Sequence, residues 1–238
     1  MNAVTIKIIY DNCKIDNTFQ EGWGFSCLVD VGHRKILFDT GADSQAFHAN
    51  LRKLGIRCEE ITDVVFSHKH GDHTEGLEDV VGKLMPDSRL FLPKRFPPKK
   101  IPSHVSTTIV KDFHEIDAGI FSLVLKGGFL LYEQALIITT PQGLVVITGC
   151  AHPGIVNLLE TVKQRLQQPI HLVLGGFHLF KTKQSDVDTI IHHLKALPVQ
   201  IAAPCHCSGE AAIKRFQDAF EDRFYKVGTG TVLTIENS

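Results

Sequence analysis

Apolar and polar residues in the first third of the chain form short runs that are typical of β-strands joined by turns. The predicted strands span residues 4–10, 25–31, 34–38 and 62–66. One helix interrupts them between a capping Asp43 or Ser44 and Gly55, because apolar residues recur there at helical spacing. Hairpins are therefore expected to dominate this part of the chain.

From residue 121 onward, predicted strands alternate with predicted helices. The strands span 121–125, 135–139, 144–148, 170–174, 199–203 and 231–235, and the helices span 153–168, 186–197 and a segment that opens at Ser208. This order predicts an α/β (α+β) chain in which two sheets pack face to face with helices outside, a four-layer αββα sandwich. No linker, repeat or low-complexity tract divides residues 1–238, so we expect a single domain.

The segment from about 85 to 117 has a different pattern. Its prolines break regular structure, and its charged residues make it locally basic. They are Pro93, Pro97, Pro98 and Pro102, with Lys94, Arg95, Lys99 and Lys100. We predict a loop-rich insertion, which is either a lid over a functional site or a plain surface loop.

Composition narrows the class of protein. The 238 residues are 43% hydrophobic and carry a net charge of −1. The chain therefore lacks the excess of positive charge that is typical of proteins that bind nucleic acid. No apolar run reaches the roughly 18 residues that span a bilayer, and the start of the first predicted strand close to Met1 leads us to expect no signal peptide. The six cysteines are scattered, so we expect free thiols and a cytoplasmic protein that binds neither membrane nor nucleic acid.

The segment Ser67–His73 carries the strongest chemical signal. His68, His70, Asp72 and His73 fall within six residues after a predicted buried strand, and imidazole and carboxylate groups bind zinc and similar metals. In an extended segment His68 and His70 project to the same side. A turn at Gly71 that other residues cannot adopt would then bring in Asp72 and His73 as a second pair. The spacing predicts two adjacent metals, whereas the alternative is a polar surface turn.

Three further histidines, His152, His178 and His206, lie at ends of predicted strands beside small residues. An isolated histidine there is commonly structural, but an incomplete metal site favours ligation. We assign three histidines to one metal, and Asp72 with two further histidines to the other. The first set is His68, His70 and His152, and the second is Asp72, His73 and His206.

Three ligands per metal leave open positions, as in catalytic sites. Two divalent metals would lower the pKa of a bridging water to about 7 or below, so that a metal-bound hydroxide attacks at neutral pH. We expect zinc, although manganese or iron would also fit. Asp72 and His178 are the candidate catalytic residues. Asp39 either orients a ligand histidine or caps the next helix.

The His68-x-His70-x-Asp72-His73 cluster resembles the signature of the metallo-β-lactamase superfamily. Asp39 matches that family's first motif and His206 its last. The usual bridging aspartate is replaced by Cys150. This residue is a small buried hydrophobe, a soft metal ligand, or a residue that contacts the metal ligands without binding the metal. Segments 148–155, 175–179 and 204–209 resemble one branch, the 7,8-dihydropterin-6-methyl-4-(β-D-ribofuranosyl)-aminobenzene-5′-phosphate synthase-like proteins. That resemblance implies a pterin and a phosphorylated sugar-aryl substrate.

Helices are predicted to begin directly after His73, His152 and His206, and helix N-termini favour anions. His178 would bind that anion or donate a proton to the leaving group. The leading hypothesis is a dinuclear metal-dependent hydrolase of a small anionic ester that contains phosphate. The alternatives are a transferase that joins a pterin to a phosphoribosyl-aryl amine, and a non-enzymatic sensor that keeps the metal site. Trp23 either flanks the substrate or packs, and packing is favoured.

Overall fold

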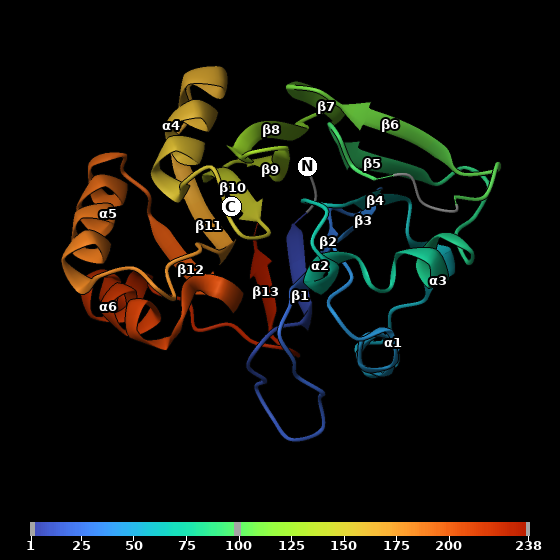
Figure 1. Ribbon diagram of the computed structural model, residues 1–238, viewed down its shortest axis with the longest axis horizontal. Coiled ribbons are helices and arrows are strands. Elements are labelled where there is room, and N and C mark those ends of the chain that lie inside the picture. Colours follow the sequence, from blue (N-terminus) through green and yellow to red (C-terminus); the bar gives the residue numbers. More distant parts are fainter. Residues whose placement is uncertain (1–2, 98–100, 237–238) are drawn as a thin grey trace. The chain divides into compact units, whose positions relative to one another are not determined.

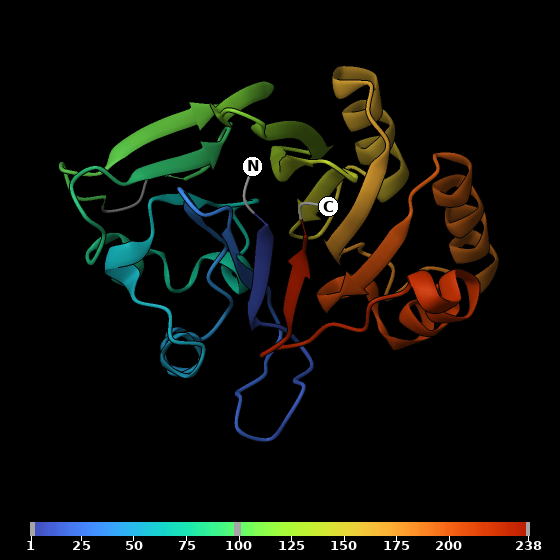
Figure 2. The same ribbon diagram turned by 180° about the vertical axis from the view of Figure 1, so that it is seen from behind.

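The computed structural model describes residues 3–97 and 101–236, which fall into two compact units. Unit 1 comprises Met1–Lys111 and Val227–Ser238, and unit 2 comprises Asp112–Lys226. Each unit contains one mixed β-sheet and its own helices (Figures 1 and 2). Among the residues described, every helix is too short or too polar to cross a bilayer.

Unit 1 is built on a seven-stranded sheet in the order β13-β1-β2-β3-β4-β5-β6. The strands are β1 (Val4–Tyr10), β2 (Ser26–Asp30), β3 (Lys35–Phe38), β4 (Asp63–Val65), β5 (Arg89–Pro93), β6 (Ser106–Val110) and β13 (Val232–Ile235). Strands β3 to β6 run parallel, with Phe38 paired to Val65. The residues that follow β3 and β4 therefore emerge side by side at one edge of the sheet.

The helices of unit 1 are α1 (Ser44–Lys53), α2 (Gly71–Thr74) and α3 (Leu77–Val81), with a 3₁₀ turn η1 (Cys58–Glu60). Asp43 caps α1, because its carboxylate accepts hydrogen bonds from the backbone N–H groups of Gln45 and Ala46. Phe47 and Leu51 of α1 and Leu77 and Val80 of α3 are buried with apolar residues of the sheet in one core. Hydrophobic burial on one face of each helix thus fixes the segments that flank the histidine motif.

Unit 2 is built on a six-stranded sheet in the order β12-β11-β10-β9-β8-β7. The strands are β7 (Phe113–Asp117), β8 (Ile120–Gly128), β9 (Leu131–Thr140), β10 (Gly143–Thr148), β11 (Ile170–Gly176) and β12 (Ile201–Cys205). Strands β7 to β10 are antiparallel, whereas β10, β11 and β12 are parallel. Thr148 pairs with Gly175, and Gly176 pairs with Cys205, so these three strands end at the same edge.

Three amphipathic helices, α4 (Ile155–Leu166), α5 (Gln184–Ala196) and α6 (Glu210–Phe220), pack on this sheet (Figure 1). The 3₁₀ turns η2 (His206–Ser208) and η3 (Glu221–Arg223) flank α6. Leu158, Val162, Leu194 and Phe216 lie in one buried cluster with apolar residues of the strands. This alternation of parallel strand and helix is the pattern that the sequence predicts for the second half.

The loop-rich insertion predicted for residues 85–117 is wrong where three strands form. β5, β6 and β7 lie within it, and Pro93 is the last residue of β5. The apolar run Leu90–Leu92 is buried and pairs with β4 and β6, which outweighs the proline signal. Among the described residues of this segment, irregular backbone remains at 85–88, 94–97, 101–105 and 111–112, and Pro98, Lys99 and Lys100 lie outside the described residues. The lid and the single domain stay predictions.

Candidate metal centre

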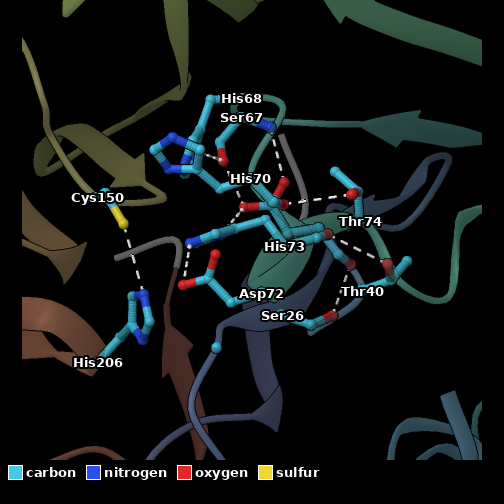
Figure 3. A network of polar contacts seen from close by, with 12 residues as sticks. Ser26, Thr40, Ser67, His68, His70, Asp72, His73, Thr74, Cys150 and His206 are labelled. Atoms are coloured by element: carbon cyan, nitrogen blue, oxygen red, sulfur yellow. Dashed lines mark hydrogen bonds and ion pairs between the residues drawn. The ribbon is translucent and has the colours of Figure 1, made fainter. Parts of the chain in front are cut away.

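The histidine motif that follows β4 forms the N-terminal cluster, which we define as His68, His70, Asp72 and His73. His68 and His73 are fully buried, whereas His70 is exposed. His68 Nε2 lies 3.0 Å from His70 Nδ1, and His73 Nε2 lies 3.8 Å from an oxygen of Asp72. Figure 3 shows these side chains converging from the end of β4 and from α2. Two pairs of potential ligand atoms are thus within unit 1.

Asp39 organises this cluster from the end of β3. Its fully buried carboxylate accepts hydrogen bonds from the Ser67 backbone N–H at 2.7 Å and the Ser67 hydroxyl at 2.5 Å. It also binds His73 Nδ1 at 2.7 Å, and the Ser67 hydroxyl lies 2.9 Å from His68 Nδ1. Both histidines are therefore held through Nδ1, so Nε2 is the ring nitrogen that would bind a metal. Asp43, and not Asp39, caps α1.

The sequence-based role of Gly71 is wrong. Gly71 is the first residue of α2, it lies outside the left-handed region, and a Cβ added there would meet open space. The start of a helix, which any residue can form, brings Asp72 and His73 inward. Gly24 carries the conformational demand instead, since its φ is +151° and an added Cβ would lie 2.4 Å from the Asp72 carbonyl oxygen.

Alanine substitutions should separate these two glycines. Gly71→Ala should leave the protein as stable as the parent or raise its stability by up to about 1 kcal/mol, because alanine favours helix. Gly24→Ala should destabilise it by several kcal/mol, roughly 2–4, because its Cβ must displace backbone. Urea unfolding of the metal-free proteins measures both values, and equal losses would contradict this reading of the turn.

The C-terminal cluster gathers at the ends of β10, β11 and β12, and we define it as Cys150, His152, His178, His206 and Cys207. Two sets of three place their ligand atoms within 4.8 Å of one another. One set is Cys150, His152 and His178, and the other is Cys150, His206 and Cys207. Cys150 Sγ lies 3.4 Å from His206 Nε2 (Figure 3).

Strained backbone conformations occur at residues of the candidate metal centre. Asp39, Ala151, His178 and His206 all adopt left-handed φ values between 48° and 57°, although none is glycine. Such conformations are costly and persist where surrounding contacts fix them, often at functional sites. Three of these residues lie at the ends of β10, β11 and β12, so the strain coincides with the C-terminal cluster.

Cys207 adds a thiol that the sequence analysis did not single out, although Cys205-His206-Cys207 is a dense run of donors. Burial raises the pKa of the Cys207 thiol, but hydrogen bonds from Cys150 and His178 and the charge of His206 outweigh it and lower the pKa to about 5. Cys150, Cys207 and His206 are all buried. The donors on this side of the cluster are therefore sulfur and imidazole, a combination suited to zinc.

Glu133 is the second residue that sequence reasoning missed. It lies near the start of β9, is 3% exposed, and binds His152 Nδ1 at 2.8 Å. A charged residue just ahead of the apolar run 135–139 gave no signal in a sequence read for histidine and cysteine. Its contact with His152 is the counterpart in unit 2 of the contact between Asp39 and His73 in unit 1.

A pocket of about 460 Å³ opens beside His152 and His178. Its apolar wall is formed by Ile155, Val156, Phe177, Leu179 and Ile190. His178 is exposed, and its ring lies 4.6 Å from that of His152, centroid to centroid. The pocket gives unit 2 room for the organic part of a ligand next to candidate metal ligands.

The predicted helix starts hold only in part. α4 begins at Ile155 shortly after His152, but His73 lies inside α2, and the 3₁₀ turn η2 separates His206 from α6.

Trp23 is 51% exposed, which contradicts the expectation that it packs.

Comparisons with known proteins find relatives of similar sequence and fold. A family model described as Anti-Pycsar protein Apyc1 matches residues 17–101. The 7,8-dihydropterin-6-methyl-4-(β-D-ribofuranosyl)-aminobenzene-5′-phosphate synthase of Methanocaldococcus jannaschii is 24% identical, over 98% of this chain and 96% of the relative. Tm1679, a metal-dependent hydrolase of the β-lactamase superfamily, is 29% identical and superposes with a TM-score of 0.84, over 98% of this chain and 99% of its own.

The metallo-β-lactamase fold protein YhfI from Bacillus subtilis superposes with a TM-score of 0.68 at 13% identity, over 98% of this chain and all of its own. The chain therefore has the metallo-β-lactamase fold, and the predicted fold class is confirmed. In sequence and fold the chain resembles a metal-dependent hydrolase of the β-lactamase superfamily, and over nearly its whole length it resembles the archaeal dihydropterin-related synthase.

Proposed function

We propose that this chain is a metal-dependent hydrolase that uses two divalent metals to cleave a small anionic, phosphate-containing ester. One observation carries the proposal. Each unit presents converging metal donors, and in each a buried carboxylate holds a cluster histidine through Nδ1, Asp39 with His73 and Glu133 with His152. Carboxylate–histidine pairs of this kind are typical of metal sites.

The donor chemistry fits divalent metals. We assign His68, His70 and His152 to one metal and Asp72, His73 and His206 to the other. The 3.0 Å approach of His68 Nε2 to His70 Nδ1 suits a shared cation, as does the neighbouring pair of Asp72 and His73. The thiol of Cys150 next to His206 would favour zinc over manganese at the second position, because sulfur is a soft ligand. Divalent metals held there would supply an activated water as nucleophile.

The remaining residues would bind and orient the substrate. The apolar wall beside His152 would take its organic group, while the N-terminus of α4, which has no side-chain cap, would favour its phosphate. Asp72 would hold the attacking water in place from the N-terminal cluster. The exposed His178 at the same pocket would bind the anion or donate a proton to the leaving group.

A transferase that joins a pterin to a phosphoribosyl-aryl amine is the second candidate, favoured by the synthase relative that matches 98% of this chain. It predicts tight pterin binding, which calorimetric titration would detect. A non-enzymatic sensor is the third candidate, and it predicts that His73→Ala leaves ligand binding intact.

Metal removal tests the hydrolase proposal. Purified protein should contain two metal equivalents and should hydrolyse members of a panel of chromogenic phosphodiesters, lactones and thioesters. Dialysis against a chelator should abolish the hydrolysis, and added zinc, manganese or iron should restore it. Aryl esters should be preferred over methyl esters if the apolar pocket binds the organic group. Protein that is free of metal as isolated and inactive after metal addition would refute the proposal.

A further inference from the structure

Glu133 makes an unusually complete set of hydrogen bonds for one buried carboxylate. One oxygen accepts from the backbone N–H groups of Cys150 and Ala151, each at 2.7 Å. The other accepts from the backbone N–H of His152 and binds its Nδ1, each at 2.8 Å. A buried carboxylate is stable only when it is satisfied in this way. The side chain is thus fixed against the whole segment 150–152.

These bonds support a bend that would otherwise be strained. Ala151 has a φ of 53°, and its N–H points to Glu133. On the other side β8 approaches closely, because a Cβ added at Gly127 would lie 2.6 Å from His152 Cβ. His152 is therefore confined between the β9 carboxylate and the β8 backbone, with little freedom to turn its ring.

We propose that Glu133 is the positioning residue of the C-terminal cluster, which fixes His152 in the tautomer with hydrogen on Nδ1. A carboxylate at this site only accepts hydrogen bonds, so Nδ1 must carry the hydrogen. Nε2 then keeps its lone pair and is the ring nitrogen that can bind a metal. The inference rests on the proposed role of His152 as a ligand. It makes Glu133 the counterpart of Asp39, so that each unit contributes one carboxylate-oriented histidine.

The first test needs neither metal nor substrate. Long-range ¹H–¹⁵N NMR of the metal-free parent protein at a pH of about 8, where an ordinary histidine is neutral, reports which ring nitrogen carries hydrogen. His152→Ala assigns the signal by its disappearance. We expect hydrogen on Nδ1 of His152. Hydrogen on Nε2 would overturn the inference.

Glu133→Gln provides the second test. Its amide group would direct N–H donors at either His152 or the 150–151 backbone, so His152 should shift toward the Nε2–H tautomer. Zinc affinity, measured by competition with a chromophoric chelator, should fall about 10- to 100-fold. The matched control is Glu115→Gln on the exposed side of β7, which should change neither quantity. A folded Glu133→Gln protein with unchanged tautomer and zinc affinity would refute the positioning role.

If Glu133→Gln does not fold, the parent tautomer still decides the question, and Glu133→Asp gives a milder change. The shorter side chain keeps the charge but cannot reach every donor that Glu133 binds, so its zinc affinity should lie between those of the parent and of His152→Ala. These outcomes are separate from the proposed activity. A protein that binds metal and shows Nδ1–H but hydrolyses nothing in the panel would refute the hydrolase and leave the role of Glu133 intact.

Discussion

Asp39→Asn should weaken the binding of both proposed metals and destabilise the metal-free fold. The carboxylate of Asp39 accepts from the Ser67 N–H and hydroxyl and binds His73 Nδ1, whereas an amide offers one acceptor oxygen. At least one buried donor is then left unsatisfied, which costs about 1–3 kcal/mol, and loss of the charge adds to it. Asparagine tolerates the left-handed φ of 57° at this position, so backbone strain should contribute little.

Metal affinity should fall about 10- to 100-fold at the ion held by His73, and also at the ion held by His68, which Asp39 reaches through Ser67. Urea unfolding of metal-free protein isolates the stability loss, and chelator competition gives the affinities. Asp30→Asn is the matched control, since Asp30 is at the end of β2 in the same sheet and accepts an exposed hydrogen bond from the backbone N–H of Gly32. Ser67→Ala should affect His68 alone and spare the His73 ion. An Asp39→Asn protein that behaves like Asp30→Asn would contradict this account.

The sequence predicted features that local patterns determine. Apolar periodicity marked the strands and helices, and the spacing of His68, His70, Asp72 and His73 marked one candidate cluster without any knowledge of tertiary contacts. The turn expected at Gly71 is wrong, because a glycine inside a metal motif is compatible both with a left-handed φ and with the first turn of a short helix, and the structure has the helix. The strands within residues 85–117 were missed because prolines at strand ends and in loops looked like breaks within strands.

The groups that hold the ligands could not be predicted from local patterns. Glu133 lies 19 residues before His152, and they meet only because β9 pairs with β10 in a fixed register. Asp39 and Ser67 are likewise joined by the parallel pairing of β3 with β4. Such contacts depend on strand pairing, whereas sequence spacing reports only neighbours along the chain. The donors stand out in the sequence because they are chemically rare, and their supporting carboxylates do not.

The largest effects are expected when ligands of the proposed metals are removed. His73→Ala and His206→Ala should each lower the metal content from two equivalents to one, because both residues are assigned to the second ion. Hydrolysis should fall on the order of a thousand-fold or more in each, since a bound metal contributes several kcal/mol of transition-state stabilisation. The double variant should still hold one metal and should be no less active than either single variant, because residues that act on one ion are strongly non-additive.

A second pair tests the assignment by contrast. His68→Ala combined with His206→Ala removes one ligand from each ion, so this double variant should hold no metal after gel filtration. His192→Ala on the exposed face of α5 removes a histidine outside both clusters and should keep two metals and full activity. Metal analysis by mass spectrometry on all five proteins decides the outcome. If the His73/His206 pair lost both metals while the His68/His206 pair kept one, the ligands would be shared differently from the assignment.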